Sequence, residues 1–124
     1  MKPADLEQLL DLATVVAYGA ATWDWYGIHY DPRTVEEAKL PAPIVDGQML
    51  GALLAKHAMG SAPEGTRVTR MSFRFKAMVF AGDTIRCTGE VESSEGRKVR
   101  IKQRIVVGDR VAIEDAWTEL ELPE

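Results

Sequence analysis

The sequence predicts a single α+β domain, covering residues 1–124, in which an antiparallel sheet wraps around one apolar helix. Residues 49–59 are apolar on nearly every face of a helix, interrupted only by Lys56 and His57, and a helix of that kind is usually buried. From Arg67 onward, apolar and polar residues alternate with a period of two, which is typical of strands that bury one face. A buried helix and half-buried strands that share one core form a two-layer α+β arrangement.

The N-terminal part of the chain predicts only short elements. Segment 4–12 carries leucines in a mixed pattern and fits either a short helix started by Pro3 or an N-terminal strand. Residues 14–16 (Thr-Val-Val) favour a brief extended piece, because β-branched side chains fit strands well. The alanine-rich segment 17–23 is expected to be helical, with a break supplied by Gly27.

The middle of the chain leads into the central helix. Thr34 and Glu37 fit a capping box, so a short helix is expected from Val35 to about Leu40. Asp46 is expected to be the N-cap of the central helix, with Gly47 in its first turn.

The C-terminal half predicts four strands joined by turns. The alternating runs are Met71–Phe75, Ile85–Val91, Val99–Val107 and Val111–Leu122. Glu95-Gly96 and Gly108-Asp109 stand where hairpin turns belong, so the strands are expected to form an antiparallel meander. The last run changes phase near Glu114-Asp115, which predicts a bulge there.

Composition narrows the class of protein. The chain has 124 residues, of which 46% are hydrophobic and 27% charged, as in ordinary globular domains. The net charge of −4 argues against nucleic acid as the main partner. A single cysteine, Cys87, allows no internal disulfide and suits a reducing compartment. We find no apolar signal core and no run long enough to cross a bilayer, so we expect a cytoplasmic protein without a membrane partner.

The stretch from Asp24 to Asp31 places a carboxylate and an imidazole on a tight turn rich in aromatic residues. Asp24 and His29 are separated by four residues, including Gly27, which loosens the turn. Imidazole ordinarily titrates near neutral pH, which suits a group that gives and takes protons, and a carboxylate can hold a water beside it. The residues alone leave two interpretations open: a catalytic pair, or a capping aspartate and a structural histidine.

The pattern Asp24-x-x-x-x-His29-x-Asp31, followed by Pro-Ile-Val-x-Gly47 at a helix start, resembles the MaoC-like (R)-specific enoyl-CoA hydratases. The resemblance extends over most of the chain, because that family also has long strands after the helix. It implies the hot-dog fold, with Asp24 and His29 as catalytic residues. It also implies that the Gly47 N–H binds the thioester carbonyl, at a helix start that favours negative charge. A glycine needed only for close packing is the alternative.

The resemblance also implies a reaction. It is that of an enoyl-CoA hydratase, a hydro-lyase that adds water to a trans-2-enoyl thioester or runs in reverse, in the degradation of fatty acids or steroids. Coenzyme A is then part of the acyl-CoA substrate, and neither a separate cofactor nor a metal is expected. Tyr26 and Tyr30, with Trp23 and Trp25, are expected to shape the substrate pocket. The short segment before the motif looks most like the small subunits of two-chain hydratases that act on steroid side-chain CoA esters.

Asp46 departs from the family pattern, which often has histidine immediately before the glycine. A charged carboxylate there would oppose an oxyanion unless it is turned away or engaged as the N-cap. We favour the N-cap, and we count Asp46 among the substrate-binding residues together with Gly47. His57 and Cys87 are expected to be structural. With two histidines and one cysteine, the sequence shows no metal-ligand cluster.

Two other functions stay open. A hot-dog thioesterase would need a carboxylate or water-positioning residue on the central helix, and Gln48 or Asp46 could serve. A non-catalytic subunit would only complete a partner's pocket, although the intact Asp24/His29 pair argues against this. A single sheet around one helix leaves an edge open, so a dimer is expected, either of two identical chains or with another hot-dog chain.

Basic residues are unevenly placed. Residues 67–110 hold 11 Lys and Arg against 5 Asp and Glu. This segment is either a solvated strand face or, in part, a surface that receives the phosphates of coenzyme A.

Overall fold

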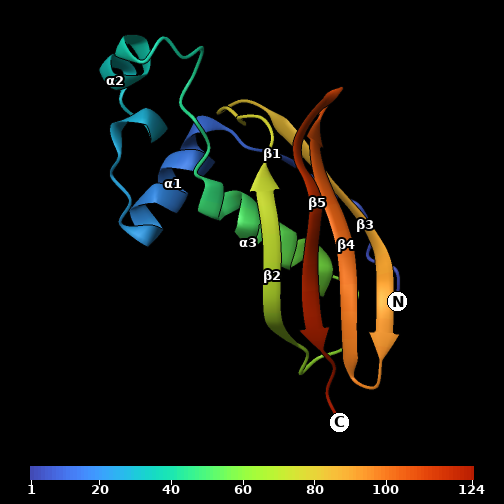
Figure 1. Cartoon of the computed structure of the whole chain (residues 1–124). Coiled ribbons are helices and arrows are strands. Elements are labelled where there is room, and N and C mark those ends of the chain that lie inside the picture. Colours follow the sequence, from blue (N-terminus) through green and yellow to red (C-terminus); the bar gives the residue numbers. More distant parts are fainter.

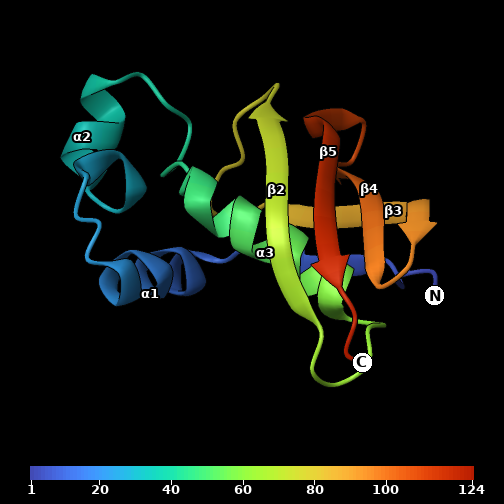
Figure 2. The same ribbon diagram turned by 60° about the horizontal axis from the view of Figure 1, so that its bottom comes forward.

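One long helix lies against one face of a five-stranded antiparallel sheet (Figure 1). The computed structural model describes all residues from Met1 to Glu124. The elements in chain order are β1 (Leu6–Leu9), α1 (Leu12–Thr22), the 3₁₀ turn η1 (Gly27–His29), α2 (Pro32–Glu37), α3 (Gly47–Met59), β2 (Arg67–Phe75), β3 (Thr84–Glu95), β4 (Lys98–Val107) and β5 (Arg110–Glu121). Helices α1 and α2 lie beside the N-terminal end of α3, away from the long strands (Figure 2). No helix combines the length and the apolar character needed to span a membrane.

The strand order is β1-β3-β4-β5-β2. The predicted hairpins are confirmed between β3 and β4 and between β4 and β5, where Gly96 (φ 60°) and Gly108 (φ 57°) take the left-handed conformation. The predicted meander is wrong for β2, which pairs with β5 from Arg67↔Glu121 to Phe75↔Ile113. The connection after β2 has no tight hairpin turn, so the neighbour of β2 is decided by packing rather than by local turn chemistry.

The predicted bulge in the last strand is confirmed. Asp115 has a φ of 54°, and the pairing register with β4 shifts between Gln103 and Ile105. This extra residue moves the buried face of β5 from Ile113 to Ala116.

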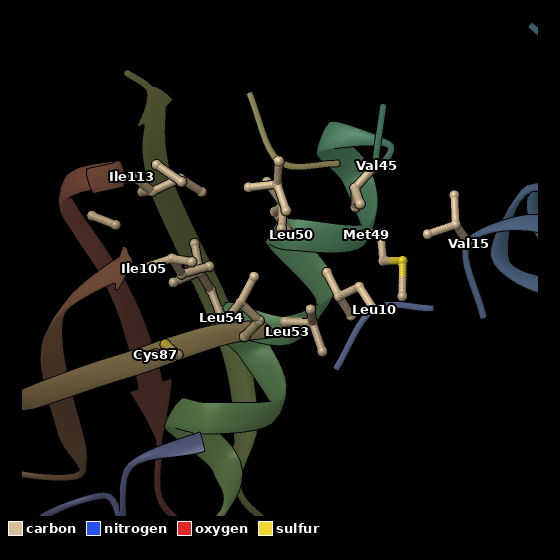
Figure 3. Close-up of a cluster of buried hydrophobic side chains, with 14 residues drawn as sticks. Leu10, Val15, Val45, Met49, Leu50, Leu53, Leu54, Cys87, Ile105 and Ile113 are labelled. Atoms are coloured by element: carbon tan, nitrogen blue, oxygen red, sulfur yellow. The ribbon is translucent and has the colours of Figure 1, made fainter. Parts of the chain in front are cut away.

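The main core lies between α3 and the sheet (Figure 3). Leu50 and Leu54 of α3 point toward Ile105 and Ile113 of the sheet, and all four are at most 2% exposed. The helix also meets residues of the N-terminal elements on its other side, including Leu10. The helix is therefore buried on most faces, as its sequence predicts.

The N-terminal elements differ in part from the prediction. Segment 4–12 contains strand β1, which settles the open alternative, and β1 pairs with β3. The extended piece predicted at residues 14–16 is wrong, because these residues belong to α1. The Asp11 carboxylate caps α1 by accepting from the Thr14 N–H at 2.8 Å, and Val15 is only 2% exposed. Capping and burial of the helix outweigh the small helix penalty of β-branched residues.

The second short helix begins earlier than predicted. Helix α2 starts at Pro32, and its N-cap is Asp31, whose carboxylate accepts from the Arg33 N–H at 3.0 Å. The capping box predicted at Thr34 is therefore wrong, since Asp31 already occupies that role and proline suits the first helical position. The N-cap predicted for α3 is confirmed, because Asp46 accepts from the Gln48 N–H at 2.9 Å.

Candidate active site

The turn after α1 brings Asp24 and His29 together. Trp23 ends α1 in the left-handed conformation (φ 58°) and redirects the chain. Asp24 Oδ1 accepts from the Tyr26 N–H at 3.2 Å, and His29 is the last residue of η1. His29 Nε2 and Asp24 Oδ2 are 3.8 Å apart, so the two groups that the sequence proposes as a pair face the same point.

The backbone holds the His29 ring in one orientation. Its Nδ1 lies 2.6 Å from the carbonyl oxygen of Ile44. A carbonyl can only accept, so Nδ1 carries the hydrogen and Nε2 is the atom turned toward Asp24. His29 N–H also donates to the carbonyl of Tyr26 at 3.0 Å. The segment that precedes α3 thus selects the tautomer of a histidine fifteen residues earlier in the chain.

Asp46 is a third member of this cluster. One atom each of Asp24, His29 and Asp46 lie within 4.8 Å of one another. Asp46 is only 8% exposed, and burial, followed by the neighbouring Asp24 side chain, raises its pKa. The Asp46 side chain is in turn the largest cause that lowers the pKa of Asp24, followed by the Tyr26 N–H. The cluster therefore separates two neighbouring carboxyl groups into a more acidic one and a less acidic one.

Gly47 is the first residue of α3 and lies under an aromatic ring. A β-carbon there would come within 2.6 Å of Phe75 Cζ, and one turn later a β-carbon at Gly51 would come within 2.7 Å of Phe73 Cζ. These glycines let β2 pack directly on the helix. The Gly47 N–H donates to no backbone or side-chain acceptor of the chain. It is one of the free donors at the positive end of a helix, where negative charge is stabilised.

An apolar cavity of about 170 Å³ adjoins both His29 and Gly47. It is lined by His29, Ile44, Val45, Gly47, Leu50, Phe75, Ala77, Met78 and Val79. A second pocket of about 10 Å³ lies on the side of Asp24, Trp25, His29 and Tyr30. That volume is close to what one water molecule needs. His29 lines both spaces, so it stands between an apolar cavity and a water-sized one.

The aromatic residues of the turn lie at the surface rather than in the apolar cavity. Tyr26 packs edge-on to the His29 ring with centroids 5.8 Å apart, and Trp25 packs edge-on to Tyr30 at 6.0 Å. Tyr26 and Trp23 are 62% and 79% exposed. Trp25 and Tyr30 border the small pocket, and none of the four lines the larger one. Their expected contact with substrate stays a prediction.

His57 and Cys87 occupy structural positions, as the sequence predicts. Gln103 Nε2 donates to the Leu54 carbonyl and lies 2.8 Å from His57 Nδ1, and Thr118 donates to Gln103 Oε1 at 2.6 Å. His57 is 3% exposed, and burial lowers its pKa. Cys87 is fully buried, which raises the pKa of its thiol to about 12. Neither residue belongs to the Asp24 cluster.

Just over half of the basic residues in segment 67–110 are paired with acids. Six arginines form ion pairs: Arg67 and Arg97 with Glu121, Arg86 with Asp5, Arg100 with Glu119, Arg104 with Glu114, and Arg110 with Asp83. These ion pairs favour the interpretation of segment 67–110 as a solvated strand face. The expectation that part of this face receives phosphates stays a prediction.

Two parts of the site have no signal in the sequence pattern. The Ile44 carbonyl that orients His29 is a backbone atom, and its role depends only on how the segment before α3 folds back. Asp46 lies close to Asp24 although the two residues are far apart in the chain. The sequence shows only that each of the two motifs contains an acidic residue, and it does not show that these residues come together.

Comparison with known proteins gives consistent matches. Residues 3–115 match the family described as MaoC like domain. The (R)-specific enoyl-CoA hydratase of Aeromonas caviae is 32% identical over 90 residues, which cover 72% of this chain and 66% of that protein, just under two thirds of its length.

Two solved structures have nearly the same fold. The (R)-hydratase from A. caviae involved in PHA biosynthesis has a TM-score of 0.88 at 26% identity, covering 99% of this chain and 97% of that one. A chain of the ChsH1-ChsH2 complex from Mycobacterium tuberculosis has a TM-score of 0.90 at 18% identity, covering 99% and 98%. The sheet wrapped around α3 is thus the hot-dog fold that the motifs imply. The chain belongs to the family of MaoC-like domains.

Proposed function

We propose that the chain is a hydratase of enoyl thioesters, adding water to a trans-2-enoyl thioester to give a 3-hydroxyacyl thioester, or catalysing the reverse dehydration. One observation carries the proposal: His29 Nε2 faces Asp24 Oδ2 at 3.8 Å on the border of an apolar cavity that also reaches Gly47. A proton-transfer pair and a free helix N–H on one cavity are what such an addition requires. Membership in the MaoC-like family and the hydratase relative support it.

The reaction divides between the two ends of the site. A water held by Asp24 and His29 gives its oxygen to C3 of the substrate, while its proton passes to one of these two groups. The electrons of the double bond move toward the thioester carbonyl, so that negative charge develops on the carbonyl oxygen. A proton returned to C2 completes the addition of H and OH. In the reverse direction the same pair removes the C2 proton and protonates the leaving hydroxyl.

Gly47 is the group proposed to hold the carbonyl oxygen. Its N–H has no acceptor within the chain and lies at the start of a helix of 13 residues. An oxyanion there accepts a hydrogen bond and meets the positive end of the helix dipole. The acyl chain beyond the carbonyl would occupy the apolar cavity beside Leu50, Phe75 and Met78.

A second hot-dog chain is proposed to complete this site. Strand β2 is an edge strand of nine residues, and apolar side chains at or beside it, Val68, Phe75 and Met78, are 37%, 56% and 52% exposed. Open edges and exposed apolar surface are usually covered in assemblies. One of the similar structures is a two-protein complex by its name, ChsH1-ChsH2. The partner here is either a second copy of the chain or a related one.

The test is a direct assay with crotonyl-CoA and longer enoyl-CoAs, in both directions. We expect loss of the enoyl absorbance with no release of free thiol, and formation of a 3-hydroxyacyl product. Release of thiol without hydration would instead indicate a thioesterase. Absence of both activities in the pure chain, with hydration appearing only when a partner chain is added and surviving loss of Asp24 and His29, would indicate a non-catalytic subunit.

A further inference from the structure

The carboxyl group of Asp46 has one oxygen engaged and one without a partner. Oδ1 accepts the Gln48 N–H at 2.9 Å, as an N-cap does. Oδ2 is fully buried and has no hydrogen-bond partner. The residue is 8% exposed, so more than nine tenths of it is removed from solvent. A buried carboxylate oxygen without a donor is unfavourable, and this one therefore requires an explanation.

The groups around Asp46 include no lysine or arginine that would balance a negative charge. They are Asp24 from the turn after α1, His29 from η1 and Tyr18 from α1, and the pKa of Tyr18 is raised by burial and by Asp46. Asp24 is itself an acceptor, and the atoms of the cluster lie within 4.8 Å of one another. Two carboxyl groups this close ionise together only at a large cost. A proton held between them removes that cost and also satisfies the buried Oδ2.

We propose that Asp46 carries a proton and donates it from Oδ2 to Asp24, so that Asp46 is a positioning residue that keeps Asp24 charged and correctly oriented. The inference deepens the proposed function and rests on it for its role in hydration, though not for the proton itself. The directions of the pKa shifts agree, since the pKa of Asp46 is raised by burial and by Asp24 while that of Asp24 is lowered, chiefly by the Asp46 side chain.

A neutral Asp46 also removes the conflict that its sequence position creates. A carboxylate next to Gly47 would repel an oxyanion forming at the Gly47 N–H. With the proton in place, Asp46 caps α3 through Oδ1, supports Asp24 through Oδ2 and adds no charge at the helix start. The two carboxyl groups titrate as one pair. At alkaline pH the pair loses its remaining proton. Asp46 then no longer donates a hydrogen bond to Asp24, and it carries a negative charge next to Gly47.

Two variants of Asp46 separate capping from proton donation. Asp46→Asn keeps an oxygen for the Gln48 N–H and an N–H to donate to Asp24, and it does not titrate. Asp46→Ser keeps a good N-cap but is too short to reach Asp24. In acid, where Asp46 holds its proton, we expect both to retain the melting temperature of the wild type. Near neutral pH we expect Asp46→Asn to keep most of the kcat that Asp46→Ser loses, and to hold its kcat further into the alkaline range than the wild type does.

For Asp46→Ser we expect kcat to fall roughly 10- to 100-fold, as for a lost hydrogen bond to a charged group, with little change in KM. Equal activities of the Asn and Ser variants across the pH range would overturn the proposal, because capping alone would then explain Asp46. The proposal would also be overturned if the kcat of Asp46→Asn fell at the same alkaline pH as that of the wild type.

A titration that needs no activity tests the shared proton directly. The carboxyl carbons of ¹³C-labelled aspartates are followed by NMR against pH, with Asp46→Asn and Asp24→Ala used for assignment. We expect the Asp46 midpoint to fall toward the ordinary carboxyl value in Asp24→Ala, since both the acceptor and the like charge are gone. An unchanged midpoint contradicts the proposal. Coupled titration without hydration would refute only the proposed function, and hydration with independent titrations would refute only this inference.

Discussion

The ring of Phe75 occupies the space that any side chain at position 47 would need, since a β-carbon on Gly47 would lie 2.6 Å from Phe75 Cζ. This contact gives Gly47 a packing role, independent of its proposed role in binding the thioester carbonyl. Removing the Phe75 ring by substitution allows the two roles to be separated.

Proline at position 47 would remove the N–H, since proline is well tolerated at the first position of a helix and has no N–H. Asp46, the residue before it, already has the extended conformation that precedes proline (φ −59°, ψ 131°).

The first prediction therefore compares Gly47→Pro with Gly47→Ala, each combined with Phe75→Ala. Both double variants are expected to fold, and they differ chiefly in the N–H at position 47. We expect the Gly47→Pro pair to have a kcat about 10²–10³-fold lower than the Gly47→Ala pair, the range found for loss of one oxyanion donor. The measurement is steady-state hydration of crotonyl-CoA, with circular dichroism as the check on folding. Equal kcat values would leave Gly47 with packing alone.

The sequence predicts the local features of this site better than the distant ones. The Asp46 cap and the bulge at Asp115 depend on neighbouring residues, and both are correct. The pairing of β2 with β5 depends on how the whole core packs, and no turn residue in the sequence indicates it. In the same way, the sequence indicates Asp24 and His29 as a pair. Their third neighbour, Asp46, is brought in only by the fold.

The second prediction concerns the Asp24/His29 pair. Asp24→Asn preserves shape but removes the charge that holds the water, and His29→Ala removes the imidazole. General acid–base catalysis contributes ~10²–10⁴-fold, so each change should lower kcat by about that factor. The double variant should be scarcely worse than the poorer single one, because the two groups act as a unit.

The matched control for this pair is His57→Gln. It changes the other histidine and keeps an acceptor for the Gln103 side chain in the buried network. We expect it to retain most activity. Near-normal hydration by a folded double variant of Asp24 and His29 would falsify the catalytic assignment and would favour the interpretation of the chain as a non-catalytic subunit.

The third prediction is the pH dependence of stability at Asp46. Its pKa is raised above 3.8 in the folded state, first by burial and then by Asp24. The folded protein thus holds a proton that the unfolded chain releases, so this contribution to stability is complete below 3.8 and is lost as pH rises through the folded value. Asp46→Asn does not titrate there. We expect its melting temperature to match the wild type in acid and to exceed it increasingly toward neutral pH. A difference that is constant with pH would contradict the raised pKa.

The fourth prediction concerns metal ions. Asp24, His29 and Asp46 offer three ligand atoms within 4.8 Å, a set that could contact a divalent cation. Such an ion would have to displace the proton shared by the two carboxyl groups, and the proposed reaction needs no metal. We expect full activity after exhaustive dialysis against EDTA. A large loss that a divalent ion restores would show instead that the cluster is a metal site.

The last prediction concerns assembly through the edge strand β2. A charged side chain on an edge strand opposes pairing with another sheet, so Val68→Lys should weaken a dimer that forms there. Val91→Lys is the matched control, because Val91 on β3 is 38% exposed and Val68 is 37% exposed. We expect the wild type and Val91→Lys to sediment as dimers at micromolar concentration and Val68→Lys to shift toward monomer. The cavity reaches Phe75 at this edge, so we also expect activity to fall as the dimer dissociates. A fully active monomeric wild type, or dissociation caused by Val91→Lys but not by Val68→Lys, would exclude β2 as the interface that completes the site.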